Sequence, residues 1–93
     1  MDDILGCLIT ATAGRDNGRI FVVVSRVDNN YYLIADGKYR RIEKPKKKKL
    51  RHIKVIVDAD IDILQPLDVK ENITNKQLRE KINSYEIHMK DRL

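Results

Sequence analysis

Basic side chains are concentrated in one short stretch of the 93-residue chain, "KYRRIEKPKKKKLRHIK" at residues 38–54. This stretch holds ten of the chain's 19 Lys and Arg residues and a single acidic residue, Glu43. A surface with so many uncompensated cations attracts a polyanion, because Lys and Arg neutralise phosphate charge. The stretch therefore predicts phosphate contacts from Lys38, Arg40, Arg41, Lys44, Lys46, Lys47, Lys48, Lys49, Arg51, His52 and Lys54.

The lysine run at residues 46–49 has two other interpretations. It could be a solvated loop with no fixed partner, or "KPKKKKLR" could serve as a nuclear localisation signal. We favour a phosphate anchor. Since lysines act as mobile point charges, such an anchor would add affinity and little sequence preference. His52 could contact phosphate or simply pack.

A second basic element is the glycine-punctuated segment "GRDNGR" at residues 14–19. Gly14 and Gly18 predict a tight turn whose backbone can approach a phosphate closely, and Arg15 and Arg19 supply forked donors for phosphate oxygens. We place Asn17 in the same contact surface. The segment is not a P-loop, because no Gly-Lys-Ser/Thr follows it.

Three tyrosines interleave with these cations: Tyr31, Tyr32 and Tyr39. An exposed tyrosine can stack on an unpaired base, which contributes about 1–3 kcal/mol per base. Adjacent side chains in a strand point to opposite faces. We therefore expect one of Tyr31 and Tyr32 in the core and the other to be a candidate for stacking.

The sequence contains no arrangement typical of catalysis or of a metal site. Cys7 is the single cysteine, so it forms no disulfide within the chain, and neither histidine has a second one at ligand spacing. "DADID" at residues 58–62 begins like a calcium loop, but Ile63 and Val69 stand where that loop needs Gly and Glu. We expect no enzymatic activity, no cofactor and no metal.

The chain also lacks the features of a membrane or secreted protein. No apolar stretch approaches the roughly 20 residues needed to span a bilayer, and the start, "MDDILGCLITATAG", lacks the basic region of a signal peptide. We expect a cytoplasmic monomer.

The sequence from residue 4 to residue 57 predicts short strands that would position these side chains. Residues 4–13, 19–27 and 31–35 are rich in β-branched and aromatic residues, and 38–43 and 52–57 follow as shorter candidates. Asp36-Gly37 predicts a type I′ hairpin turn between 31–35 and 38–43. Five short strands hide their edges best by curling into a small barrel. Residues 20–24 would be its central strand, covered on both faces.

The C-terminal segment predicts a helix over residues 75–91. Thr74 and Gln77 have the spacing of a capping box, and an apolar stripe follows, formed by Leu78, Ile82, Tyr85 and Met89. We expect this stripe to pack on the barrel and to cover the second face of the central strand.

The stretches "AGRDNGR", "FVVV", "ADG", "RR" and "EKPKKKKLRH" in this order resemble the KOW motif, a glycine-punctuated strand–loop–strand element. The likeness is greatest to the "fourteen-e" type of large-subunit ribosomal protein and its small bacterial relatives, over about 50 of the 93 residues. It implies an SH3-like barrel over residues 1–58 with a basic loop at 44–51. An acidic connector at 59–74 and the helix at 75–91 would complete a single domain.

This resemblance implies RNA binding, with ribosomal RNA or another structured RNA as the partner. It makes the glycine loop and the basic residues the contact surface, associates the protein with ribosomes in the cytoplasm, and adds ribosomal proteins as further partners. The alternative is a protein-interaction module of the translation or transcription machinery that docks through the barrel edge. The two functions differ in how strongly salt should weaken binding.

Overall fold

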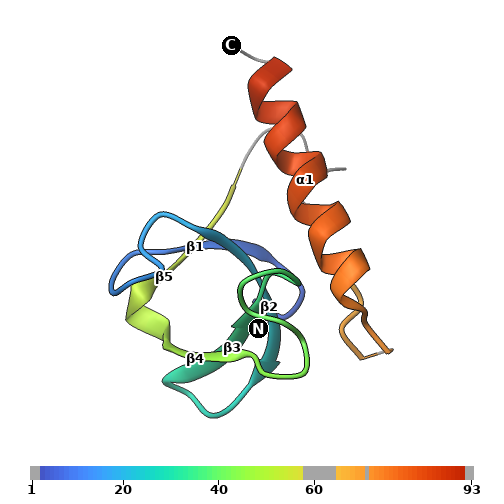
Figure 1. The fold of residues 1–93 in the computed structure, drawn as a ribbon. Coiled ribbons are helices and arrows are strands. Elements are labelled where there is room, and N and C mark those ends of the chain that lie inside the picture. The colour runs from blue at the N-terminus through green and yellow to red at the C-terminus, as the bar shows by residue number, and fades with distance from the viewer. Residues whose placement is uncertain (1–2, 58–64, 71, 92–93) are drawn as a thin grey trace.

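The apolar run at residues 20–24 lies in the central strand of one antiparallel sheet. A computed structural model of the chain describes residues 3–57, 65–70 and 72–91, and Figure 1 shows the arrangement of its elements. In chain order these are β1 (Leu8–Ala11), β2 (Ile20–Arg26), β3 (Tyr31–Ala35), β4 (Lys46–Lys49), the 3₁₀ helix η1 (Leu50–His52), β5 (Ile53–Val55) and α1 (Asn75–Asp91). The prediction of a mainly β fold with one C-terminal helix is confirmed.

The sheet is strongly curled. Its strand order is β4-β3-β2-β1-β5, yet only the three residues of η1 separate the two edge strands in the chain. A flat five-stranded sheet would hold its edges about 19 Å apart, which a three-residue turn rising about 2 Å per residue cannot bridge. The strands therefore run around a ring, with η1 between β4 and β5 (Figure 1). Since β4 and β5 do not pair with each other, the barrel expected from the sequence is an open one.

Residues of β2 alternate between two cores, one on each face of the sheet. Phe21 and Val23 point into the curl, where they pack with Ile9 and Ile34. Val22 points outward into a second core that includes Leu8, Ala35, Leu78 and Ile82. Because α1 supplies Leu78 and Ile82, the helix is the outer cover of the central strand. Both the buried central strand and the packing of the helix stripe were predicted correctly.

The connection between β3 and β4 corrects two predictions. Residues 38–43 do not form a strand, and Asp36-Gly37 is not a type I′ turn, because Gly37 has a positive φ but Asp36 does not. Instead the Asp36 carboxylate accepts hydrogen bonds from the backbone N–H groups of Lys38, at 2.9 Å, and Arg40, at 2.8 Å. The side chain of Asp36 thus folds residues 36–40 into a compact loop where the sequence suggested a two-residue hairpin.

The return strand is the lysine run itself. Residues 46–49 pair with β3 from Tyr31↔Lys49 to Ile34↔Lys46, so the predicted basic loop at 44–51 is wrong over most of its length. Lysine has a low intrinsic strand propensity, and this is why the run reads as a loop. It is well suited to an edge strand, however, because charged side chains discourage the edge from pairing with another chain.

The start of α1 is fixed by the capping box predicted from the sequence. The Gln77 N–H donates to Thr74 Oγ1 over 3.1 Å, and the Thr74 N–H donates to Gln77 Oε1 over 2.8 Å. Along the stripe, Leu78 and Ile82 are buried, and Tyr85 and Met89 are half-buried. Within the described parts of the chain, no helix has the length and apolar character needed to cross a membrane.

Asn75 joins the first turn of the helix to the segment before β4. Its Oδ1 accepts a hydrogen bond from the Ile42 N–H at 2.7 Å, and its Nδ2 donates to Glu43 Oε1 at 2.7 Å. This hydrogen bond lowers the pKa of Glu43. Residues 59–64 and 71 of the predicted acidic connector, together with Asp58 and thus all of "DADID", lie outside the described residues.

Candidate nucleic-acid interface

Strand β4 presents its lysines alternately to solvent and to the core. Lys47, which is exposed, and Lys49, which is half-buried, both approach Tyr31, with their Nζ atoms 4.6 and 5.8 Å from the centroid of its ring. Tyr32, the next residue of β3, is 7% exposed and belongs to the inner core. The prediction that one tyrosine of this pair is buried is therefore confirmed, and Tyr31 is the one that stands among cations at the surface.

Lys48 does not share the position of its neighbours. It pairs with Tyr32 across the ladder, is only 8% exposed, and donates from Nζ to the Ala13 carbonyl at 2.7 Å. A side chain so engaged ties β4 to the glycine loop and cannot also reach a phosphate. Although the sequence suggested Lys48 as a phosphate contact, its position is that of a structural residue.

The glycine loop is a tight turn, with φ of 80° at Gly14 and 85° at Gly18. Asp16 is 3% exposed at its base, and its carboxylate is 3.0 Å from the Arg40 guanidinium. The backbone N–H of Gly18 donates to the Ala11 carbonyl at 2.8 Å. The turn holds Arg15, Asn17 and Arg19 in exposed positions, as a phosphate-binding loop requires.

Tyr39 forms a second aromatic centre beside this loop. Its ring is 61% exposed, and the Arg19 guanidinium lies over it at 4.3 Å from the centroid. Lys38 Nζ is 5.1 Å from the same centroid. A guanidinium stacked on a ring keeps its edge free for phosphate while the pair offers a flat surface to a base.

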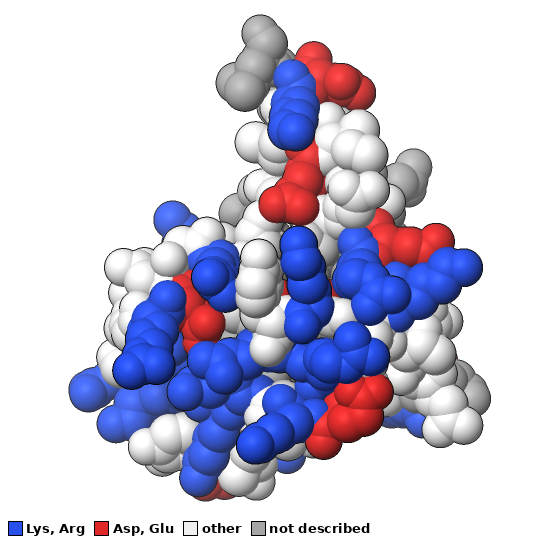
Figure 2. All heavy atoms as spheres, viewed as in Figure 1, with Lys and Arg blue, Asp and Glu red and all other residues white. Residues whose placement is uncertain are grey.

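Each aromatic centre borders a hollow in the surface. A concavity of about 490 Å³ extends from Tyr39 along β4 to Lys47, and another of about 410 Å³ lies between Tyr31 and Arg51. Figure 2 shows Lys and Arg side chains gathered over the sheet on this face of the molecule. We call this the basic surface, and its members are Arg15, Arg19, Tyr31, Lys38, Tyr39, Lys44, Lys46, Lys47, Lys49 and Arg51.

The other residues proposed from the sequence are placed less favourably. Arg40 is held by Asp16, and Arg41 lies 3.4 Å from Glu43. Within the described ranges these are the only ion pairs formed by the basic stretch at 38–54. His52 is half-buried in η1, where its carbonyl accepts a bond from the Thr12 N–H at 3.0 Å. Lys54 is exposed on β5 and lines neither of these two concavities.

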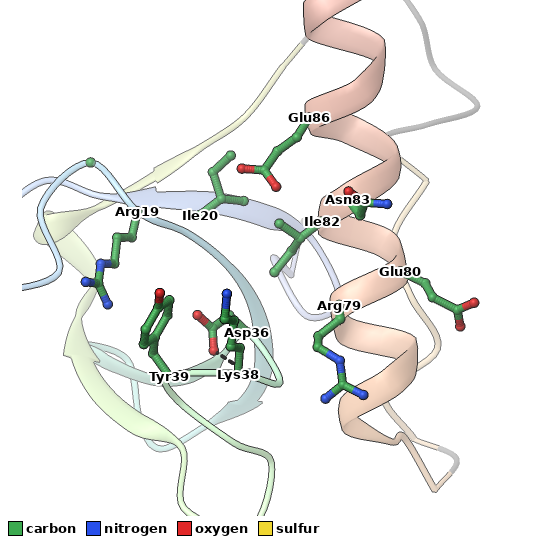
Figure 3. Close-up of a pocket in the computed structure, with 11 residues that line it drawn as sticks. Arg19, Ile20, Asp36, Lys38, Tyr39, Arg79, Glu80, Ile82, Asn83 and Glu86 are labelled. Atoms are coloured by element: carbon green, nitrogen blue, oxygen red, sulfur yellow. Dashed lines mark hydrogen bonds between the residues drawn. The ribbon is translucent and has the colours of Figure 1, made fainter.

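Sequence reasoning missed a contribution from the helix. A groove of about 630 Å³ lies between the glycine loop, the 36–40 loop and α1. Figure 3 shows Arg19 and Tyr39 on its sheet side, and side chains from α1 on the other. The helix residues are Arg79, Glu80, Ile82, Asn83 and Glu86. The i, i+4, i+7 spacing of Arg79, Asn83 and Glu86 places them on one face of the helix.

The described residues provide no group of three or more His, Cys, Asp or Glu side chains that could hold a metal ion. Cys7 is partly buried, and this burial raises the pKa of its thiol, which disfavours the reactive thiolate. No protein-family model matches the chain, and a search of curated proteins finds no match either.

Proposed function

We propose that this protein binds RNA through the basic surface. The observation that carries the proposal is the pairing of aromatic rings at the surface with cations: the half-buried Tyr31 beside Lys47 and Lys49, and the exposed Tyr39 beneath Arg19. Lysine and arginine neutralise the phosphate backbone, and the rings supply platforms for unpaired bases. This combination is typical of RNA recognition, where unstacked bases are splayed out onto aromatic side chains.

The strand conformation of the lysine run supports the same proposal. Residues two apart in a strand are separated by about 6.8 Å and point the same way, so Lys47 and Lys49 form a row on an ordered backbone. A row of this kind binds phosphates without the entropy cost of ordering a whole loop. Its contacts carry no sequence information, because every nucleotide has the same phosphate.

The salt dependence of binding tests the proposal directly. If the basic surface neutralises about five or six phosphates, affinity for RNA should fall by about two to three decades between roughly 50 and 200 mM salt. Affinity that stays flat over this range would contradict it. A flat response would favour a protein-interaction module instead, for which the unpaired outer edge of β5 in the open barrel is the natural docking place.

The resemblance to the KOW family extends the proposal to the ribosome and to the cytoplasm. A barrel this small offers a modest contact face, since single nucleic-acid-binding modules bury about 600–1,000 Å², and such a face suits a folded RNA on which several phosphate backbones converge. A cell lysate sedimented through a sucrose gradient separates a ribosomal component from a free factor. We expect the protein to follow the large subunit through a moderate salt wash. Protein that remains at the top of the gradient in low salt would contradict ribosome association but not RNA binding.

A further inference from the structure

The two walls of the groove between the sheet and α1 carry opposite charges. On the sheet side it presents Arg19, Lys38 and the exposed ring of Tyr39. On the helix side it presents the amide of Asn83 and the carboxylate of Glu86, which extends from α1 toward Ile20 in Figure 3. A ligand that fits must therefore combine negative charge at one end with hydrogen-bond donors at the other.

Two other charged groups of the groove are already occupied by the fold. The Asp36 carboxylate accepts two backbone N–H groups of its own loop. The Arg79 guanidinium donates to the Gly37 carbonyl at 2.7 Å, which holds the helix against that loop. Arg19 and Lys38 remain as cations for a ligand, and Glu86 remains as an acceptor opposite them.

The floor of the groove is apolar and the groove has the size of a small-molecule site. Ile20 and Ile82 form this floor, and Ile82 is 9% exposed. The volume of about 630 Å³ lies within the range of about 300–1,000 Å³ that is usual for small ligands. A flat ring can thus lie on apolar side chains with one edge turned to the helix.

We propose that this groove receives one unpaired nucleotide of the bound RNA and prefers a guanine base. The phosphate would contact Arg19 and Lys38, and the base would stack against the Arg19–Tyr39 pair. The adjacent N1–H and N2–H donors of guanine would face the Glu86 carboxylate, with Asn83 beside it. Uracil has a single donor, N3–H, flanked by two carbonyl oxygens that would face the carboxylate unfavourably, so it is disfavoured. This inference rests on the proposed RNA-binding function and adds the class of nucleotide and a role for the helix.

An acidic peptide fits the groove less well. It would bring its carboxylates close to Glu86, and like charges facing each other across a contact oppose binding. The division of charge across the groove therefore favours a nucleotide over a peptide.

Three RNA hairpins test the inference, identical except for one bulged nucleotide that is guanosine, uridine or absent. The wild-type protein should bind the guanosine bulge at least about fivefold more tightly than the uridine bulge. Glu86→Gln should abolish this preference. Asp91→Asn, the same charge change at an exposed position at the end of α1, should retain it. Tyr39→Leu should weaken binding of the bulged hairpins by about fivefold or more and weaken binding of the paired hairpin much less.

The outcomes separate this inference from the function on which it rests. Salt-sensitive binding that is equal for all three hairpins would overturn the groove assignment and leave RNA binding intact. Absence of binding to any hairpin would overturn both. If poly-glutamate bound in a Tyr39-dependent manner while the hairpins bound alike, the groove would belong to a protein ligand and the inference would be wrong. Residues 39, 86 and 91 are all exposed, so these variants should fold normally.

Discussion

Lys47 and Lys48 are neighbours in the sequence, yet strand alternation gives them opposite roles. Lys47 faces solvent beside Tyr31, whereas Lys48 faces inward and donates to Ala13. A charge-assisted hydrogen bond at a largely buried position contributes more to stability than one in water. At the scale of single residues, the run "KKKK" is therefore not one uniform patch of charge.

This difference predicts distinct effects of two matched substitutions. Lys48→Met keeps the aliphatic stem but leaves the Ala13 carbonyl without its donor, so the free energy of unfolding should fall by about 1–3 kcal/mol. Lys47→Met should leave the free energy of unfolding nearly unchanged and should weaken RNA binding instead. Urea denaturation and a binding titration of both variants measure this. Equal stability of the two proteins would show that the bond to Ala13 contributes little.

Glu43 gives a prediction about pH. Its hydrogen bond from Asn75 lowers the pKa of the carboxyl group in the folded protein below the ordinary value of 4.5. A group whose pKa is lowered by folding stabilises the protein above its unfolded pKa and loses this effect as the pH falls through the folded value. Wild type should therefore be more stable than Glu43→Gln at neutral pH, and the difference should shrink as the pH falls below 4.5. A difference that is the same at pH 7 and well below the folded pKa would contradict this.

At the scale of elements, the 36–40 loop and the helix fix each other. Gly37 has φ near 79°, and a Cβ atom at this position would clash with the backbone carbonyl oxygen of Asn75. The same loop accepts the guanidinium of Arg79 at its Gly37 carbonyl. The position of the helix, and with it one wall of the groove, thus depends on the absence of a side chain at residue 37.

Gly37→Ala and Gly18→Ala form a matched pair that tests this dependence. Both glycines have a positive φ, which costs an alanine about 1–2 kcal/mol. A Cβ at Gly18 meets nothing within 4 Å, so this cost should be its whole effect on stability. Gly37→Ala should lose about 1–3 kcal/mol more, because its Cβ overpacks the contact with the helix. Thermal unfolding of the two variants measures this difference in stability. Equal losses of stability would show that the loop accommodates a Cβ atom at residue 37 without strain.

At the scale of the whole molecule, local patterns predicted well and long-range pairing did not. The apolar run at 20–24 and the Thr74–Gln77 capping box were readable because neighbouring residues alone determine them. The lysine strand was not readable, since lysine does not favour strands. It is placed by pairing with β3 and by the short η1 turn that closes the curl. The buried role of Lys48 and the helix wall of the groove were missed for the same reason, because both depend on contacts between distant segments.

The curled sheet brings the glycine loop and β4 onto one surface, and these two parts should contribute differently to binding. Replacing Lys47 and Lys49 by alanine should weaken binding to all RNAs about equally and should reduce the slope of log affinity against log salt by about 1.4–1.8, the value for two phosphates. Replacing Arg15 and Arg19 should weaken binding to a folded RNA more than binding to a homopolymer, because a rigid turn fits a particular backbone shape. Lys76 and Lys90 on α1, both exposed, provide a control with the same loss of charge. If all three double variants lost equal affinity on both substrates, net charge alone would account for binding, and neither the strand nor the loop would have a specific role.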